Sequence, residues 1–525
     1  MQVGTATVQT DPYGYFKFQD VSVTKNAALI TVTKNGYFKT VKTYIANPGK
    51  SAFFRIKLIP KTIAGNLNAN SGGTVITADG MSITLPASSV VLSSSNVPYS
   101  GTVNIAAQWL SPARDDLADI MPGDLRGLST DESLQLLTTF GMAAVELTGA
   151  GGEALQIATG KKASISFPLP PAYVSAAPAT ISLWYFDEKS GLWKEEGKAT
   201  KSGSSYSGEV AHFSFWNCDI PCSYVHFDCS FVTPSGNPIQ HAFVKISDVN
   251  NNMNKRYGYT DSAGYVGGAV PDNAMLLLEV FSNAGSTTPC YSQNFATGNT
   301  DVSLGKITVS TGVAYVTGTV TDCNDVPVVN GSVYIQYRNS FYKYPFDISG
   351  TYHFTQLLCG SSNTSCTITG IDYTTLLQSN PINYNLVNGS QTNANIKICD
   401  ILTSEYFKFT IDGISYTFTK PPDDIYQTGV GVPLRYYITA TSSTQTSRLF
   451  FEGANMAVGS HQELVQFYYH NSMKSTVNNP VTVNITEYGA IGEYVSGNFS
   501  GILQDWFTND LYEVSCSFRI KRIIF

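Results

Sequence analysis

Residues 260–268 read TDSAGYVGG, in which an Asp, two further residues and a Gly lead into an alternating strand. The same pattern returns as TDPYGYFKF at 10–18 and as FDISGTYHF at 346–354. In such a turn the Asp side chain caps the backbone, and the Gly takes a positive φ that other residues avoid. The pattern therefore predicts a β-hairpin at each of the three places.

The sequence before the turn repeats as well. PIQHAFVKI (238–246) precedes the second copy and PVVNGSVYI (327–335) precedes the third, with the same internal offsets. This is an internal repeat of about 90 residues. In the first copy the Pro-led strand would lie before Met1, so we expect residues 1–62 to be a truncated copy. An export signal or a lipid-anchor cysteine would then belong to the missing piece.

The repeat resembles the carboxypeptidase regulatory-like domain, a transthyretin-type β-sandwich in which a Pro-led strand is followed by a TD-x-x-G-x-Y hairpin. The resemblance implies β-sandwich domains at 1–62, 221–309 and 310–400. It does not imply peptidase activity, because the zinc motif of the carboxypeptidase catalytic domain is missing.

The remaining regions differ from the repeat but are also rich in strands. Region 63–220 contains the segment expected to be the only helix, PARDDLADIM (112–121), and region 401–525 reads as a final β-sandwich. The predicted fold class is all-β: a string of β-sandwich (Ig-like or transthyretin-like) domains with one larger β domain that carries a short helix.

Charge is sparse along the chain. Charged residues make up 14% of it and the net charge is −7, without basic blocks, which argues against nucleic acid as a partner. No apolar run is long enough for a transmembrane segment. Eight charged residues do cluster between Arg114 and Glu132. They lack the spacing of a calcium loop, so we expect a solvated loop with salt bridges, no metal and no cofactor.

All nine cysteines lie at or after Cys218. Cys218 and Cys222 could join with Cys229 across a hinge between two domains. The third repeat holds four cysteines that allow two bridges in three connectivities, namely Cys323, Cys359, Cys366 and Cys399. The distribution favours disulfides in an oxidising compartment over buried free thiols.

The segment VAHFSFWNCD (210–219) closes the region without cysteines. Read as a continuous strand, it places Phe213 and Phe215 on one face. The opposite face would carry His212, Ser214 and Trp216. In the simplest interpretation the two phenylalanines are core residues, and the His and Ser face solvent.

The segment also resembles the autoproteolysis motif of adhesion-type receptor ectodomains and of the related zonula-occludens/netrin-receptor type domains. In those domains two Trp-bearing strands precede a His-Phe-Ser or His-Leu-Thr at which the chain cuts itself. The matching residues here are Trp184, Trp193, Gly197 and the tripeptide His212, Phe213 and Ser214. The GGTV and ITLPASSV segments between 72 and 90 resemble the start of the netrin-receptor type domain. The cysteines that staple the receptor version are absent.

The resemblance implies that Ser214 Oγ attacks the carbonyl carbon of Phe213 and that His212 accepts the hydroxyl proton. Cleavage within an hour requires a barrier of about 22 kcal/mol, whereas an ordinary peptide bond has about 31. A general base contributes about 3 to 5 kcal/mol of the difference. The rest must come from the geometry of the amide and from oxyanion donors. The products would be fragments of 213 and 312 residues.

The arrangement resembles exported surface lipoproteins of Bacteroidota-type bacteria that string regulatory-like domains together. We therefore expect a structural or adhesive protein, exported to the cell surface, whose partner is an unknown protein or glycan. The alternative is a carbohydrate-binding accessory module that stacks sugars on some of its 31 tyrosines and five tryptophans. Enzyme fingerprints are missing, so no activity is expected beyond a single self-cleavage.

Overall fold

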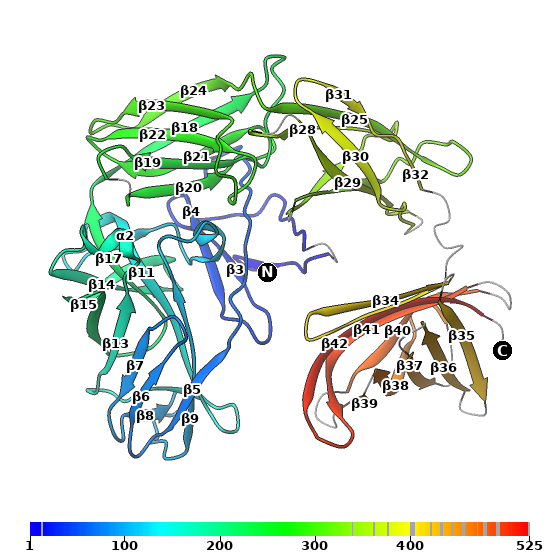
Figure 1. The fold of residues 1–525 in the computed structure, drawn as a ribbon, viewed down its shortest axis with the longest axis horizontal. Coiled ribbons are helices and arrows are strands. Elements are labelled where there is room, and N and C mark those ends of the chain that lie inside the picture. Colours follow the sequence, from blue (N-terminus) through cyan, green and yellow to red (C-terminus); the bar gives the residue numbers. More distant parts are fainter. Residues whose placement is uncertain are drawn as a thin grey trace. The chain divides into compact units, whose positions relative to one another are not determined.

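The computed structural model describes residues 1–11, 14–251, 253–338, 340–360, 363–374, 377–398, 405–420, 423–430, 434–442, 446–453, 457–469, 471–475, 480–489 and 494–522. The chain divides into two compact units. Unit 1 comprises 1–320, 327–369 and 381–396, and unit 2 comprises 321–326, 370–380 and 397–525. Nearly every element is a strand (Figure 1), which confirms the predicted all-β class.

Unit 1 begins with a small sheet and a much larger one. The small sheet has the order β2 (Ala6–Thr7), β1 (Gln2–Val3), β3 (Ala28–Val32) and β4 (Thr40–Tyr44). The large sheet has 13 strands, ten of them in the order β5 (Ile63–Asn68), β9 (Thr102–Leu110), β11 (Leu134–Gly149), β17 (Phe215–Cys222), β14 (Thr180–Asp187), β15 (Leu192–Ser202), β16 (Ser205–Val210), β13 (Ala163–Pro168), β7 (Ser82–Leu85) and β6 (Gly73–Ile76). The other three are β8 (Val90–Leu92), β10 (Arg126–Leu128) and β12 (Ala154–Ile157).

Two one-turn helices accompany the large sheet. The predicted helix at 112–121 is present only as α1 (Leu117–Ile120). A second helix, α2 (Pro171–Val174), begins with a proline in its first turn, and the expectation of a single helix was wrong.

The second and third repeats each consist of two facing sheets. In the second repeat the sheets are β21 (Tyr265–Pro271), β18 (Tyr224–Val232) and β24 (Val302–Thr308), and β20 (Lys255–Tyr259), β19 (Phe243–Asp248), β22 (Met275–Phe281) and β23 (Tyr291–Ala296). In the third they are β28 (Thr351–Leu357), β25 (Val313–Asp322), β31 (Gln391–Asn393) and β32 (Ile396–Ile398), and β27 (Ser340–Pro345), β26 (Gly331–Tyr337), β29 (Asn363–Asp372) and β30 (Ile382–Val387).

The repeated Asp-x-x-Gly turn has the predicted chemistry. In the second repeat Tyr265 N donates to Asp261 Oδ1 at 2.8 Å, Gly264 N donates to Asp261 O at 3.0 Å, and Gly264 has a φ of 75°. The third repeat has the same bonds between 347 and 351, with a Gly350 φ of 72°. The first copy shares them, although Pro12 and Tyr13 lie outside the described residues.

The topology corrects the prediction of a hairpin. β20 and β21 flank the second turn but belong to opposite sheets, so the turn is a corner between the two layers of the sandwich. At this corner, Gly264 packs closely against the backbone of β18. A Cβ on Gly264 would lie 2.3 Å from Phe231 O, so the glycine is required by close packing as well as by its φ.

A turn of the same kind escaped prediction because it has no glycine. Val326 N donates to Asp322 Oδ1 at 2.9 Å, and Asp325 takes the positive φ of 63°. Asp tolerates this conformation better than most residues with a side chain.

Unit 2 has a ten-stranded antiparallel sheet that folds over one core of buried apolar residues. Within this core the ring of Phe409 lies 5.1 Å from that of Phe467, and the ring of Phe451 lies 5.7 Å from that of Phe518. Nine strands follow the order β34 (Ile414–Lys420), β33 (Glu405–Ile411), β42 (Leu511–Lys521), β41 (Tyr494–Asp505), β39 (Asn471–Ser475), β38 (His461–Tyr469), β37 (Thr446–Gly453), β36 (Leu434–Thr441) and β35 (Asp424–Val430). β40 (Thr482–Tyr488) pairs with β38 and β41. Among the described residues, no helix is long and apolar enough to cross a membrane.

Candidate functional site

The tripeptide His212-Phe213-Ser214 lies in a bend between two strands, not within one strand as predicted. β16 ends at Val210 and pairs with β13 and β15, whereas β17 begins at Phe215 and lies between β11 and β14. In the order of the sheet, β14 and β15 separate the two strands. Residues 211–214, called the link below, therefore carry the chain from one part of the sheet to another.

The bend also corrects the predicted faces. Phe213 is buried in the same apolar cluster as Trp216. Phe215 lies in the other cluster of the large sheet, together with Trp184 and Trp193. Because the bend interrupts the strict alternation, Phe213 and Phe215 do not share a face.

Hydrogen bonds from beyond the link hold each of its last three carbonyl groups. The donors are Trp216 Nε1 to His212 O at 3.0 Å, Gln156 Nε2 to Phe213 O at 3.1 Å, and Val145 N to Ser214 O at 3.3 Å. The path of the backbone through the tripeptide is therefore fixed by three different parts of the sheet.

Gln156 of β12 holds Phe213 from both sides. Its Oε1 accepts hydrogen bonds from Phe213 N at 2.8 Å and from Ile157 N at 3.0 Å. Its Nε2 donates to Phe213 O, as given above. Sequence reasoning missed this residue, because it lies 57 positions before Phe213 and belongs to no recognisable motif.

His212 is partly buried among aromatic rings. Its ring lies 4.7 Å from that of Tyr185, nearly perpendicular to it, and 5.1 Å from the ring of Trp216. Burial lowers the pKa of His212 below its usual value, although Glu196, with its Oε2 3.8 Å from His212 Nε2, acts in the opposite direction. The imidazole is therefore mostly neutral at pH 7, which is the form that accepts a proton.

Ser214 Oγ donates to Phe215 O at 3.1 Å. Within the described contacts, no hydrogen bond joins this hydroxyl to the His212 ring. The two predicted reactive side chains are neighbours in the link, but the hydroxyl must rotate before it can attack the Phe213 carbonyl.

The other residues that match the autoproteolysis motif build the sheet rather than the link. Trp184 and Trp193 are completely buried on β14 and β15. Gly197, with a φ of 86°, lies where the register between these two strands shifts. These residues shape the surroundings of the link and do not contact its reactive bond.

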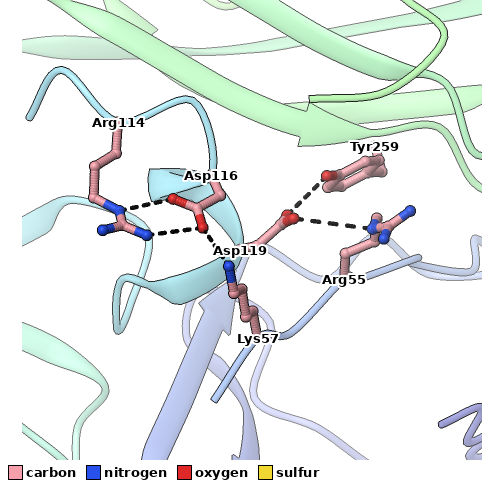
Figure 2. Close-up of polar contacts among 6 residues, drawn as sticks. All are labelled: Arg55, Lys57, Arg114, Asp116, Asp119 and Tyr259. Carbon is pink, nitrogen blue, oxygen red and sulfur yellow. Dashed lines mark hydrogen bonds and ion pairs between the residues drawn. The ribbon is translucent and has the colours of Figure 1, made fainter. Parts of the chain in front are cut away.

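A second site is the junction shown in Figure 2, where α1 meets two other regions of unit 1. The carboxylate of Asp119 accepts a hydrogen bond from the Tyr259 hydroxyl of β20 at 2.7 Å, and its other oxygen lies 3.9 Å from Arg55 Nε. Burial raises the pKa of Asp119, and the bond from Tyr259 and the charge of Arg55 oppose the rise. The nearby Lys42 is also buried, which lowers its pKa to about 8.

Asp116, on the solvent side of the same junction, is paired with two cations. Arg114 donates to both of its carboxylate oxygens, at 2.7 and 2.9 Å, and Lys57 Nζ donates at 2.8 Å. Partial burial acts to raise the pKa of Asp116, but these bonds outweigh it and lower the pKa to about 2. The expected salt bridges are present. The expectation of a solvated loop was wrong for Asp119 and for Arg126, both of which are buried.

The structure overturns part of the predicted cysteine pairing. Cys359 forms a disulfide with Cys290, and so joins the third repeat to the second instead of closing a bridge within the third. Cys323 is also disulfide-bonded, and Cys399 lies outside the described residues. The thiols that remain free include Cys218, Cys222, Cys229 and Cys366. The predicted bridge across the hinge was therefore wrong.

A cavity of about 300 Å³ lies between the end of β17 and the second repeat. Its lining is mostly polar, with Asp248, Asn254 and Asp272 among its residues. The described lining residues include no aromatic side chain, so the cavity lacks the stacking platform that the carbohydrate-binding alternative requires. Among all the residues that the structure describes, no group of three or more His, Cys, Asp or Glu side chains is suited to hold a metal ion.

Among known proteins, no family model matches this chain. Two curated proteins match parts of it. Human cartilage intermediate layer protein 2 is 34% identical over 110 residues, which cover 21% of this chain and 9% of the human protein. The mouse protein of the same name is 27% identical over 212 residues, 38% of this chain and 18% of the mouse protein. The matched region thus spans less than a fifth of these relatives.

Comparison with solved structures finds pilins of bacterial surfaces. The shaft pilin SpaA of Lactobacillus rhamnosus GG is 14% identical, with 34% of this chain and 99% of the pilin covered and a TM-score of 0.19. The minor pilin GBS52 of Streptococcus agalactiae is 8% identical, with 34% and 96% covered and a TM-score of 0.17. TM-scores this low establish no common fold. The resemblances drawn from the motifs, to regulatory-like, netrin-receptor type and lipoprotein families, stay predictions.

Proposed function

We propose that the chain is a structural or adhesive part of an exported surface protein, and that the modules within residues 1–320 act as one mechanical body. The observation that carries the proposal is the Asp119 junction. One carboxylate there contacts Arg55 from the N-terminal region and Tyr259 from the second repeat. A buried charge of this kind is costly unless its partners stay in place, so the contacts favour a fixed arrangement of the modules.

Export is supported by the disulfide between Cys290 and Cys359, because stable disulfides are typical of oxidising compartments. The curated relatives are named for a layer of cartilage, which fits a structural role. Peptide mapping of the protein isolated from its source under alkylating, non-reducing conditions tests this part. The Cys290–Cys359 crosslink is expected, and alkylated free thiols at both positions would argue against export.

Calorimetry of the full chain tests whether the modules within residues 1–320 behave as one mechanical body. We expect residues 1–320 to unfold in a single transition. Asp119→Ala should divide that transition, because Lys42 then stays buried without a nearby carboxylate and the Tyr259 hydroxyl loses its acceptor. Asp115→Ala is the matched control, since Asp115 lies only four residues before Asp119 but is exposed. More than one transition within residues 1–320 of the unaltered protein would contradict a single body.

Self-cleavage between Phe213 and Ser214 is the second candidate function, as a single turnover. It is supported by the position of the tripeptide in a bend between two strands, and by the burial of His212, which lowers its pKa and so favours the neutral ring. The products would stay together, because β17 of the second fragment pairs with β11 and β14 of the first. A denaturing gel should show two bands for the unaltered protein and one for Ser214→Ala. One band for both would remove the candidate.

A glycan array tests the alternative that the chain is a carbohydrate-binding accessory module. Binding on a glycan array should disappear when exposed aromatic residues such as Trp506 are replaced. No contact described above favours this alternative over the structural proposal.

A further inference from the structure

We infer that Gln156 is a catalytic residue of the self-cleavage, in which its Nε2 stabilises the negative charge that develops on Phe213 O. The inference rests on the self-cleavage proposed above and deepens it. It assigns the oxyanion donor, which neither the tripeptide nor its motif supplies.

The orientation of the Gln156 amide follows from its neighbours. Phe213 N and Ile157 N are both backbone donors and both point to the same amide atom, at 2.8 and 3.0 Å. Only the oxygen of the amide can accept them, so the nitrogen must be the atom that faces Phe213 O at 3.1 Å. The donor is thereby fixed before any reaction begins.

The acyl shift places charge on the atom that Gln156 contacts. The bond from Ser214 Oγ to the Phe213 carbonyl carbon forms, and the hydroxyl proton moves to the His212 ring. The carbonyl oxygen carries the negative charge of the tetrahedral intermediate. The carbon–nitrogen bond between Phe213 and Ser214 then breaks, and the nitrogen takes the proton from His212. Water hydrolyses the resulting ester to the Phe213 carboxylate and the free Ser214 hydroxyl.

A preorganised donor strengthens its hydrogen bond as this charge grows, because the donor dipole already points at the oxygen. Loss of one such donor typically slows a reaction by about 100-fold to 1000-fold. Gln156 also sits on a rigid support, since its neighbours Leu155 and Ile157 are buried in the apolar core of the large sheet. A side chain anchored in this way keeps its position while Ser214 Oγ rotates.

Gln156→Glu isolates the role of the donor. Glu has the same shape and still offers an oxygen to Phe213 N and Ile157 N, but it presents a carboxylate oxygen to Phe213 O. Gln156→Met has a similar length and neither accepts nor donates strongly. Gln108→Glu is the matched control, because Gln108 lies in the same sheet and donates only to Trp109 O at 3.3 Å.

The experiment follows the full chain after pulse-labelled cell-free synthesis, with the cleaved fraction measured over time on a denaturing gel. We expect Gln156→Glu and Gln156→Met to slow cleavage at least about 100-fold. We expect Gln108→Glu to cleave at the rate of the unaltered protein. The midpoint of thermal unfolding, measured for each variant with Ser214→Ala added, should stay within a few degrees of that of Ser214→Ala alone.

Three different outcomes would count against the inference. If the unaltered protein cleaves and Gln156→Glu cleaves equally fast, Gln156 only positions the backbone and the self-cleavage proposal stands. If the unaltered protein does not cleave, both proposals fail. A slow Gln156→Glu variant whose unfolding midpoint has also collapsed would count against a catalytic role unless Gln156→Met is slow and stable.

Discussion

The corner at Asp261–Gly264 and the link at His212–Ser214 both carry the chain between separate parts of a β structure. The corner satisfies its own polar groups, because the Asp261 side chain accepts the backbone N–H of Ala263 at 2.8 Å and that of Tyr265 at 2.8 Å. The link contains no such cap. Its carbonyl groups depend on donors from other strands, including Gln156.

The difference separates a turn that is capped by its own side chain from a bend whose backbone is held by other strands. In the corner, the Asp261 side chain caps backbone N–H groups that lie only two and four positions further along the chain. In the link, donors from other strands hold the backbone, the His212 ring packs against Tyr185, and the Ser214 hydroxyl donates to Phe215 O. Functional bends commonly rely on surrounding structure in this way.

The largest expected loss of stability comes from a substitution of Gly264 in the corner. Gly264→Ala should destabilise unit 1 by about 4 kcal/mol, because the new Cβ at a φ of 75° would lie 2.3 Å from Phe231 O. Gly14→Ala is the matched control, since Gly14 has a similar φ of 79° but no atom within 4 Å of its Cβ position. It should cost only about 1 kcal/mol. Urea denaturation measures both, and equal losses would show that φ alone decides the need for glycine.

A histidine beside the corner should make the stability of the fold depend on pH. His241, whose N–H bonds to Thr260 O, packs 4.2 Å from the Phe53 ring. Burial, assisted by the charge of Arg55, lowers its pKa to about 4. The unfolded chain therefore binds a proton between about pH 6.5 and 4 that the folded chain does not, so stability falls as the pH drops.

The loss should reach up to about 3 kcal/mol at pH 4. Urea denaturation at a series of pH values measures it. His241→Asn should flatten the curve, because Asn does not titrate and tolerates the positive φ of 59° at this position. A curve that keeps its full slope in the variant would assign the loss to other groups.

The smallest effect concerns the histidine of the link. His212 must be neutral to accept the Ser214 proton, and burial holds its pKa below the usual value. Self-cleavage should therefore be independent of pH near neutrality and should fall about tenfold for each pH unit below that pKa. Stopped time courses between pH 4.5 and 8 measure this. A rate that rises on acidification would exclude His212 as the base.

The same comparison explains what could be predicted from the sequence. The Asp261 corner was recognisable because its capping bonds join residues within four positions of one another. Its role as a crossing between sheets was not recognisable, because the partner strand β18 lies about 30 residues away. The Asp322 turn was missed because Asp325 replaces the expected glycine.

In the link, the candidate reactive residues could be predicted from the sequence, but the bend could not. His212 and Ser214 were identified from a motif, but the bend that breaks the alternation depends on how β16 and β17 pair, which is a property of the whole sheet. Gln156 had no local signal at all, and the charged cluster around Asp119 predicted salt bridges but not the burial of Asp119 against Tyr259. Both arise where the fold brings distant residues together, as does the disulfide between Cys290 and Cys359.

Self-cleavage is tested most directly by the intact mass of the freshly purified 525-residue protein under denaturing conditions, followed by sequencing of any new amino terminus. We expect two chains, one that ends at Phe213 and one that begins at Ser214. In Ser214→Ala we expect a single chain of 56.8 kDa. A single chain in the unaltered protein, or a cut at any other bond, would contradict it.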